Sequence, residues 1–458
     1  MVQVDPAFFW PKHAGDWGSG PMPAQAAQNR HQSPFTAPCP RPMAKDSMTK
    51  TALVIGAGIT GVSTALWLRR AGIAVTLIDR VPPGDAAQTS YGNAGLLARA
   101  AITPIIDGHM LAQVPRMLLD PQSPLFLKWR YLPQLFPFLL PMLRACSSAN
   151  SRRITEALLP LTEVSVDAHF ALAHGSPAAA FLRRGDYAYY YRNEQAYRQD
   201  APHNELLREM GFTVQTRDHA GMLAADPALG PRYGFAAIYP DHGWLSAPGD
   251  YVAALAAQFQ AEGGKFRRAS VRQLGNGSVQ LDDGETLTAD KIVLSAGAWS
   301  GRLAAQLGLQ SRLETERGYH LFLKGASHKP AHPFMVSDAK FVVTPMRDGL
   351  RCAGIVEFGG LDLPPSRAPL ALLKRRIRQV YPDLTWESAE EWMGFRPTTP
   401  DSLPHLGPIP GAPNVIAAFG SQHIGITIGP RLGRLAADLV LGQRSNLDLT
   451  PYRCDRFQ

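Results

Sequence analysis

A glycine-rich turn between two short apolar runs constrains this chain more than any other feature. Residues 51–55 (TALVI) predict a strand, and the pattern G-x-G-x-x-G occupies residues 56–61. Apolar residues at helical spacing follow and end at Gly72, a residue type that commonly terminates helices. Residues 73–78 (IAVTLI) predict a second strand, which leads directly into Asp79. This order predicts a strand–helix–strand unit that opens an α/β domain.

Each polar or glycine position in this unit has a separate physical role in dinucleotide binding. Gly56 permits the tight turn, Gly58 lets a pyrophosphate approach the backbone, and Gly61 lets the helix pack closely on the strand. Unpaired N–H groups at the helix start attract the phosphates, and the Asp79 carboxylate accepts from ribose hydroxyls. A lone G-x-G-x-x-G often marks nothing more than a tight turn, but all five elements in order predict a dinucleotide site. At this point FAD and NAD are not distinguished.

Three further segments carry small residues where a large planar ligand needs close backbone approach. Residues 88–96 (QTSYGNAGL) follow Asp79 after a short loop, and residues 291–300 (KIVLSAGAWS) predict a strand that ends in small residues. Residues 415–419 predict another strand, followed by the glycine-containing run 420–427 and a helix. Together these segments resemble the D-amino-acid oxidase-like flavoprotein superfamily, and most closely its bacterial D-amino-acid dehydrogenases of the small-subunit type.

The resemblance runs from about residue 51 to residue 442. Its most distinctive parts are residues 89–95, 121–143, 316–320 and 394–401. It implies a discontinuous FAD-binding Rossmann-like α/β domain with an inserted α+β substrate domain of mainly antiparallel sheet. The expected divisions are residues 51–105, 240–312 and 391–445 for the FAD-binding domain, 106–239 and 313–390 for the substrate domain, and 446–458 for a C-terminal tail.

The resemblance also implies a set of cofactor-binding residues, from the pyrophosphate to the flavin. They are Gly56, Gly58, Ile59 and Gly61 at the pyrophosphate, Asp79 and Arg80 at the adenosine ribose, Thr89, Ser90, Asn93, Ala94 and Gly95 toward the flavin, Val271 at the adenine, Ala296 and Gly297 after the third strand, and Gly425, Ile426 and Thr427 at the pyrimidine edge of the ring. A helix starting near Thr427 would direct its positive end at the negative charge of reduced flavin, which favours FAD over NAD.

The activity implied is FAD-dependent oxidative deamination of a D-amino acid. Hydride moves from Cα to flavin N5, and the resulting imino acid hydrolyses to a 2-oxo acid and ammonia. The substrate carboxylate needs a cation with fork geometry, and Arg396 is the first candidate. An ion pair of Arg396 with Asp401 or Glu391 is the structural alternative, and Arg317 is a weaker rival.

Tyr319, His320 and His423 are the other candidates for the catalytic cavity. Each can donate a hydrogen bond to substrate, or can be a satisfied polar residue of the core. No metal site is expected, because no pair of the four cysteines has ligand spacing. Three other functions remain open: oxidation of a secondary amino acid such as proline, hydroxyproline or sarcosine, an oxygen-using amino-acid oxidase, and an NAD-linked dehydrogenase or a flavin-binding protein without turnover.

The basic charge of the chain is concentrated in one aromatic segment. The formal net charge is +8, and residues 111–153 hold six Lys and Arg against Asp120 alone. Such a segment suits a peripheral contact with anionic lipid, where a quinone or another electron carrier is reached. Its alternative is a core segment with a solvated basic face. Residues 131–143 are apolar, but their three prolines are expected to break a spanning helix.

Nothing in the charge pattern requires nucleic acid. The first 50 residues, rich in Pro, Ala, Gln and His, are expected to form a disordered extension without the apolar core of a signal peptide. Translation from Met43 or Met48 is left open. A cytoplasmic location, with peripheral contact on the inner face of the cytoplasmic membrane as a further expectation, follows from these observations.

Overall fold

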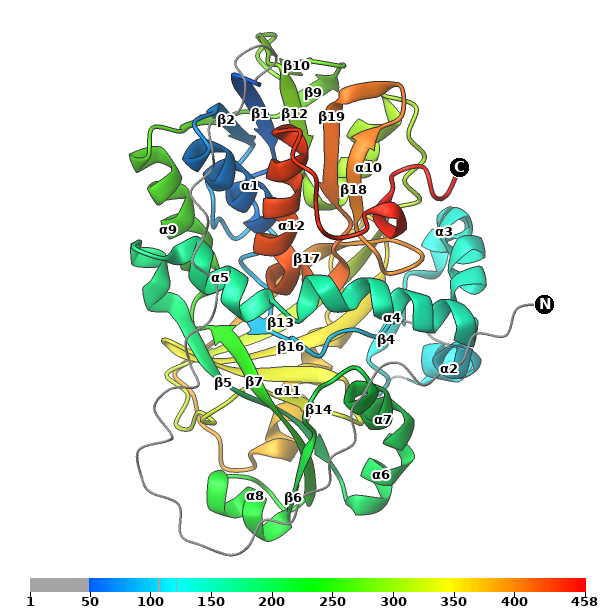
Figure 1. Ribbon diagram of the computed structural model, residues 1–458. Helices are drawn as coiled ribbons and strands as arrows, with labels where there is room; N and C mark the ends of the chain where they lie inside the picture. Colours follow the sequence, from blue (N-terminus) through cyan, green and yellow to red (C-terminus); the bar gives the residue numbers. More distant parts are fainter. Residues whose placement is uncertain (1–48, 106–107, 121) are drawn as a thin grey trace, which may run out of the picture. The chain divides into compact units, whose positions relative to one another are not determined.

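A six-stranded sheet organises the nucleotide-binding part of the molecule (Figure 1). The computed structural model describes residues 49–105, 108–120 and 122–458, so the predicted disorder of the extension and the start at Met43 or Met48 lie outside the described residues. All neighbouring strands are parallel except the pair β18 and β19. In spatial order the strands are β18 (His405–Ile409), β19 (Ala412–Phe419), β12 (Lys291–Leu294), β1 (Thr51–Ile55), β2 (Ala74–Asp79) and β8 (Lys265–Arg268).

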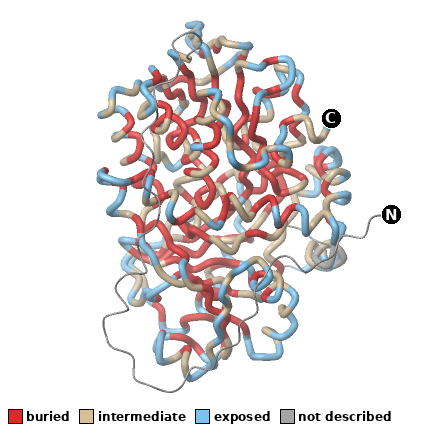
Figure 2. The backbone as a smooth tube through the Cα atoms, in the orientation of Figure 1, coloured by how far each residue is buried: buried red, intermediate tan, exposed pale blue. Residues whose placement is uncertain are grey.

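Helices cover one face of this sheet and a small second sheet lies against the other. The helices α1 (Ile59–Arg70), α9 (Pro248–Ala261) and α12 (Gly425–Val440) share one apolar cluster with the strands. The opposite cluster includes α10 (Ser300–Ala305) and the antiparallel strands β9 (Val271–Leu274), β10 (Ser278–Leu281) and β11 (Thr286–Thr288). Buried residues follow the strands closely (Figure 2). The predicted discontinuous Rossmann-like domain is confirmed, because three distant chain segments supply this one sheet.

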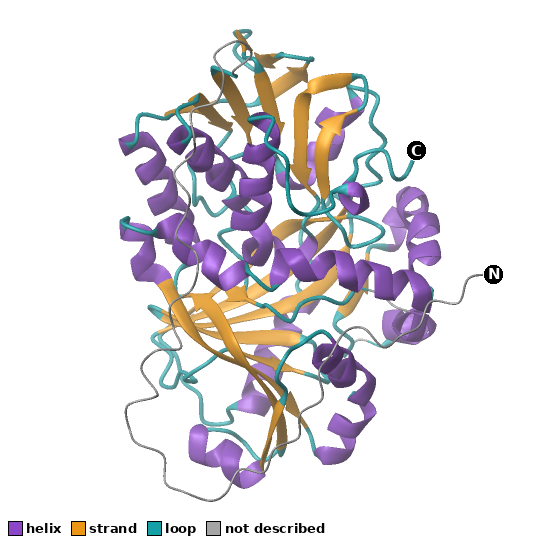
Figure 3. Ribbon diagram, in the orientation of Figure 1, coloured by secondary structure: helices purple, strands orange, loops and turns teal. Residues whose placement is uncertain are grey.

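A second, mainly antiparallel sheet forms the inserted domain (Figure 3). The pairs β14–β5 and β16–β4 are its parallel exceptions. Along the sheet the strands are β17 (Ser388–Thr398), β13 (Glu314–Lys324), β16 (Gly349–Phe358), β15 (Phe341–Met346), β14 (Phe334–Val336), β5 (Leu182–Tyr191), β7 (Phe235–Leu245) and β3 (Leu96–Leu97), with β4 (Leu125–Leu127) beside β16 and β6 (Gln215–Asp218) beside β7.

The remaining helices join or flank the two sheets. They are α2 (Gly108–Leu119), α3 (Leu132–Ala145), α4 (Ser148–Thr162), α5 (Ser165–Ala173), α6 (Glu194–Gln199), α7 (Ala201–Glu209), α8 (His219–Ala225) and α11 (Ala368–Val380), with short 3₁₀ turns η1 (Trp129–Tyr131), η2 (Pro177–Phe181), η3 (Gly297–Trp299), η4 (Gln422–Ile424) and η5 (Thr450–Tyr452). Helices α4 and α5 pack against α12, and α5 also contacts β5. The expected divisions at residues 240 and 391 fall inside β7 and β17, and both strands pair from end to end within the inserted sheet. In the C-terminal segment Arg456 pairs with Asp401.

The three prolines of residues 131–143 lie within the 14-residue helix α3. Helix α3 contains Pro133 in its first turn and Pro137 and Pro141 inside. The three prolines are four residues apart and therefore share one side of the helix, where Pro133 and Pro137 are exposed. Carbonyl groups that lose an intrahelical N–H on that side can bond to water, so the helix survives. Within the described residues no helix is both long and apolar enough to cross a membrane.

Candidate active site

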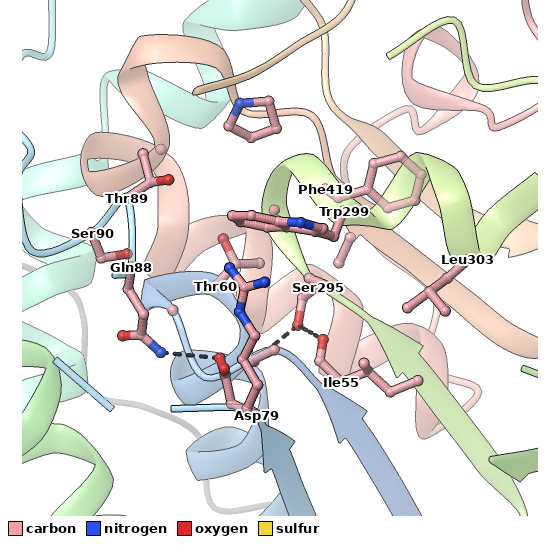
Figure 4. A pocket seen from close by; sticks show the side chains of 18 of the residues that line it. Ile55, Thr60, Asp79, Gln88, Thr89, Ser90, Ser295, Trp299, Leu303 and Phe419 are labelled. Atoms are coloured by element: carbon pink, nitrogen blue, oxygen red, sulfur yellow. Dashed lines mark hydrogen bonds between the residues drawn. The ribbon is translucent and has the colours of Figure 1, made fainter. Parts of the chain in front are cut away.

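Two cavities meet between the sheets. The first, of about 410 Å³, follows the carboxyl edge of the parallel sheet from Gly56 to Ile426 (Figure 4). The second, of about 370 Å³, is bordered by β13, β16 and β17 of the inserted sheet. Thr89 and Asn93 line both cavities, so a ligand in the first reaches the second at this loop.

The three glycines of the first turn differ in why the position requires glycine. A Cβ on Gly56 would lie 2.4 Å from the Ser295 carbonyl oxygen, and Gly56 has a φ of +102°. A Cβ on Gly61 would lie 1.8 Å from the Gly56 carbonyl oxygen. Gly58 has an ordinary φ of −73°, and a Cβ there would meet the Ser90 hydroxyl at 3.3 Å. Packing therefore requires Gly56 and Gly61, whereas Gly58 leaves space at the helix start.

Asp79 ends β2 at the wall of the first cavity. Its Oδ2 accepts from the Ala57 N–H at 2.7 Å and from Gln88 Nε2 at 3.0 Å (Figure 4). Its Oδ1 accepts from the Val81 N–H at 3.1 Å. These bonds fix the carboxylate and keep it beside the turn of the glycine motif. Gln88 was not predicted as the partner of Asp79, because the contact depends on how the loop after β2 folds back.

An aromatic platform closes the other end of the first cavity. The Arg80 guanidinium lies 3.9 Å from the centre of the Trp299 ring, and the Phe395 ring meets Trp299 at 5.4 Å in an edge-on arrangement. Val271, Ala296 and Gly297 also line this cavity, as expected for cofactor-binding residues. Trp299 was not predicted to line this cavity, because a tryptophan that follows a strand is usually a residue of the hydrophobic core.

The loop that joins the cavities is held from several sides. The Ser90 hydroxyl accepts from the Ile59 N–H at 3.1 Å, and the Thr89 hydroxyl donates to the Phe395 carbonyl at 2.7 Å. Arg351 of β16 donates to the carbonyl oxygens of Tyr91 and Asn93, at 2.9 and 2.7 Å. Arg351 was not among the predicted residues, and it holds this loop from the inserted domain. The loop is therefore fixed to both domains where a planar ligand would pass.

Helix α12 begins at Gly425, two residues before the expected position at Thr427. Gly425 and Ile426 line the first cavity, and Thr427 lines the second. The Thr427 hydroxyl donates to the Leu96 carbonyl at 3.1 Å, which ties the helix start to the segment after Ala94 and Gly95. His169 supports the same turn from behind, since its Nε2 donates to the Ile426 carbonyl at 2.8 Å. Burial lowers the pKa of His169 to about 4, so the ring stays neutral there.

Arg396 projects from β17 over Gly318 of β13. A Cβ on Gly318 would lie 2.4 Å from Arg396 Nε, so the glycine makes room for the guanidinium. The two acids suggested as ion-pair partners of Arg396 pair with other residues: Asp401 pairs with Arg456, and Glu391 pairs with Lys374. Within the described part of the chain, no hydrogen bond or ion pair engages the Arg396 side chain, which lines the second cavity. Burial lowers its pKa, although Glu316 opposes that shift.

The rival Arg317 faces away from this cavity. Its guanidinium is fully buried and donates to Glu357 and to the carbonyl oxygens of Gly360, Leu363 and Pro364. The Tyr319 hydroxyl donates to the same Glu357 carboxylate at 2.7 Å, so Tyr319 borders the cavity but does not offer its hydroxyl to it. Alternation along β13 explains this, because Arg317 and Tyr319 share the face opposite Gly318.

The two histidines occupy different surroundings. His423 lines the second cavity and is exposed to it; desolvation there, followed by the nearby Arg396 charge, lowers its pKa to about 4. His320 stacks on Trp392 at 4.9 Å, and its Nδ1 donates to the Gly92 carbonyl at 2.8 Å. Burial and the Arg351 charge hold the pKa of His320 well below its usual range. His320 therefore supports the cavity wall, whereas a neutral His423 lies where a ligand would contact it.

Comparisons with known proteins identify the family. The model of the family described as FAD dependent oxidoreductase matches residues 51–439. The chain belongs to this FAD-dependent oxidoreductase family. It is 34% identical over 416 residues to the D-amino-acid oxidase of Bradyrhizobium diazoefficiens, covering 88% of this chain and 98% of that one. It is 30% identical over 423 residues to the D-amino acid dehydrogenase of Paramagnetospirillum magneticum, with the same coverage of 88% and 98%.

Solved structures agree on the fold of this FAD-dependent oxidoreductase. Glycine oxidase from Geobacillus kaustophilus superimposes with a TM-score of 0.70 at 22% identity, over 90% of this chain and 99% of that one. L-proline dehydrogenase from P. horikoshii gives a TM-score of 0.64 at 17% identity, over 90% and 98% of the two chains. FAD is the cofactor of this family, and the turn at Gly58, the carboxylate of Asp79 and the start of α12 along one cavity suit its extended shape.

Proposed function

We propose that the protein deaminates D-amino acids oxidatively to 2-oxo acids and ammonia and passes the electrons to a respiratory acceptor. The Arg396 guanidinium is the observation that carries this proposal. It is a desolvated cation with fork geometry, lines the second cavity, and has no described partner of its own. The Glu316 carboxyl lies opposite on β13 but makes no described hydrogen bond or ion pair with this guanidinium, so the fork is available to a substrate carboxylate.

The surrounding residues suit a small amino acid. Bound FAD would supply the hydride acceptor. Arg396 would fix the plane of the carboxylate, and the neutral His423 would offer a hydrogen bond without adding charge. Apolar and aromatic side chains on the remaining wall would receive the substrate side chain and exclude water, namely Tyr187, Tyr189, Tyr239, Met335 and Val342.

An anaerobic flavin-bleaching screen tests the proposed function. We expect D-amino acids to bleach the flavin absorbance of the holoenzyme much faster than their L-enantiomers, because one hand places Cα–H toward the flavin while Arg396 holds the carboxylate. N-alkyl amino acids in the same panel test the secondary-amine alternative. Bleaching by N-alkyl or L-amino acids alone would contradict the proposal, as would a preparation that no amino acid reduces.

An oxygen-using D-amino-acid oxidase is the second candidate. Its support is the D-amino-acid oxidase of Bradyrhizobium diazoefficiens, which is 34% identical to this chain. Mixing the reduced holoenzyme with oxygen or with a soluble quinone separates the two functions. Faster reoxidation by the quinone would favour the dehydrogenase, and faster reoxidation by oxygen would favour the oxidase.

A basic apolar surface supports the respiratory acceptor. We define the α3 surface as the exposed side chains Trp129, Phe136, Leu140 and Leu143, of which Trp129 is 60% and Phe136 64% exposed. Phe136, Leu140 and Leu143 recur at helical spacing on the outer side of α3, while Leu135, Phe138 and Met142 are buried beneath. Arg130 and Arg144 lie at the two ends of this row and are exposed. Such a face fits the headgroup region of an anionic bilayer, from which a quinone in the acyl-chain interior would be reached.

Neutralising the charges of the α3 surface should weaken vesicle binding. Each basic residue near an anionic surface contributes about 1 kcal/mol, so the double variant Arg130→Gln, Arg144→Gln should partition about 30-fold less onto anionic vesicles. The double variant Arg152→Gln, Arg153→Gln removes the same charge from two exposed positions on the neighbouring helix α4 and should have a smaller effect. Equal losses in both pairs, or no binding by the parent protein, would contradict a bilayer contact at α3.

A further inference from the structure

A second charged group faces the cavity of Arg396, and the proposed function does not yet use it. Glu316 lies on β13 directly opposite Arg396 of β17 in the antiparallel register. Its side chain is almost fully buried, with 2% of the residue exposed, and it lines the second cavity. An acid and a base from adjacent strands therefore border the same cavity.

The Glu316 carboxylate differs from its acidic neighbours in having an unsatisfied oxygen. Its Oε2 is buried and accepts no hydrogen bond from any described residue. Glu314, two residues earlier on the same face, accepts from the Tyr131 hydroxyl at 2.9 Å and from the Thr315 N–H at 2.6 Å. Glu357 on β16 accepts from Arg317 and Tyr319. A buried carboxylate oxygen without a donor is costly, so the Glu316 oxygen calls for a donor that enters the cavity.

Spacing indicates which donor fits. Directly opposed residues of antiparallel strands have Cβ atoms about 5 Å apart. The guanidinium of Arg396 and the carboxyl group of Glu316 can therefore bind one small ligand together. An α-amino acid carries its carboxylate and its ammonium on one carbon. With the carboxylate at Arg396, the ammonium is the nearest donor to Glu316, whereas the cationic end of a long side chain is several bonds farther away. The pair Arg396 and Glu316 therefore matches a zwitterion.

We propose that Glu316 binds the α-ammonium of the substrate and accepts one of its protons before oxidation. This inference rests on the proposed function, because it assumes an amino-acid substrate held by Arg396. The N–H bond breaks, an O–H bond forms on Glu316, and the electron pair stays on nitrogen. That lone pair would then form the C=N bond of an iminium ion, with bound FAD supplying the acceptor for the Cα hydride.

The charges around Glu316 suit a proton acceptor near neutrality. Burial raises the pKa of the carboxyl to about 7. The Arg396 charge and the Thr398 hydroxyl, both on β17, oppose this rise, and Glu314 on the same strand adds to it. From η4, His423 lines the same cavity and is neutral, because its pKa is lowered to about 4. The β16 residue opposite Glu316 is the apolar Phe358. Glu316 is thus ionised above neutral pH and able to take a proton, and it loses this ability as pH falls below about 7.

The test compares Glu316→Gln with Glu314→Gln in the holoenzyme. The first variant removes the acceptor, and the second removes a buried acid on the same strand face that does not border the cavity. Two ligands are used: the D-amino acid that bleaches the wild-type flavin fastest, and its deamino analogue, the same carboxylic acid with hydrogen in place of the amino group. The readouts are the pH profile of anaerobic bleaching and the Kd of the deamino analogue, from its perturbation of the flavin spectrum.

For Glu316→Gln we expect bleaching to slow about 100-fold at neutral pH and to recover toward about pH 10, where the free amine enters without a protein base. The deamino analogue should bind at least as tightly as to wild type, because a negative charge has left the cavity. Glu314→Gln should keep a wild-type rate near neutral pH, with the fall in rate at acid pH moved to somewhat lower pH, because the Glu314 charge contributes to the raised pKa of Glu316. Glu316→Asp should still show the rise of the bleaching rate near neutral pH, with a lower maximal rate. This variant separates loss of the proton acceptor from loss of packing.

Three outcomes would overturn the role. Wild-type bleaching rates and pH profile in Glu316→Gln would show that no proton passes to this carboxyl. Equal weakening of the amino acid and the deamino analogue would indicate a purely structural residue. Failure of every D-amino acid to bleach the wild-type flavin would instead remove the proposed function itself, and this role with it.

Discussion

Replacing Arg396 by Met should raise the Kd of the best D-amino-acid substrate about 100-fold or more while FAD stays bound. Removing one partner of a desolvated charge pair costs about 2–5 kcal/mol in binding, because the substrate carboxylate would enter a cavity that still holds the Glu316 acid. Met has similar length and fills the space over Gly318, so the strand pair β13 and β17 should keep its packing. The measurement is the concentration dependence of anaerobic bleaching.

Two matched variants sharpen this result. Arg396→Lys keeps the charge and loses the fork, so it should fall between the wild type and the Met variant. Arg317→Met deletes a buried arginine on the opposite face, where it donates to Glu357 and three carbonyl groups, and should lower the unfolding temperature with little change in Kd. An unchanged Kd in Arg396→Met, or an equal rise in Arg317→Met, would dismiss Arg396 as the carboxylate site.

Features that depend on neighbouring residues in the chain could be predicted from the sequence. The run from residue 51 to Asp79 specifies its own turn, helix and strand, and the observed β1, α1 and β2 follow it closely. Arg396 was identified as the carboxylate candidate from its local motif, and it does border the second cavity. The local elements follow from the sequence because backbone geometry at glycine and strand alternation act over short distances, whereas the role of Arg396 in binding a carboxylate stays a prediction.

Features that depend on pairing between distant strands could not be predicted. Glu316 was not predicted as a site residue. Its importance comes from a strand register that places it opposite Arg396, 80 residues later in the chain. Arg351 was missed for the same reason, since its hydrogen-bond partners Tyr91 and Asn93 precede it by more than 250 residues. The helical conformation around the α3 prolines was not predicted, because it depends on which side of the helix meets water. Register and exposure are set by tertiary packing, which local patterns do not encode.

Replacing Gly58 by Ala should weaken FAD binding about 100-fold while the fold persists. The backbone at Gly58 has φ −73°, which alanine adopts freely, and the added Cβ would meet the Ser90 hydroxyl at 3.3 Å. That contact requires only a slight shift of the Ser90 side chain. The methyl group would nevertheless lie at the helix start, where the pyrophosphate has to approach the backbone N–H groups. Titration of the apoprotein with FAD measures the affinity, and thermal unfolding without FAD measures the fold.

The companion variants separate cofactor contact from backbone packing. Gly61→Ala places a Cβ 1.8 Å from the Gly56 carbonyl oxygen, so it should lower the unfolding temperature of the apoprotein as well as FAD affinity. Gly72→Ala, at the other end of α1, has φ +88° and no atom within 4 Å of the added Cβ. It should cost about 1 kcal/mol of stability and leave FAD affinity unchanged. Wild-type affinity in Gly58→Ala would place the pyrophosphate elsewhere, and an unfolding temperature reduced as far as in Gly61→Ala would make Gly58 a packing glycine.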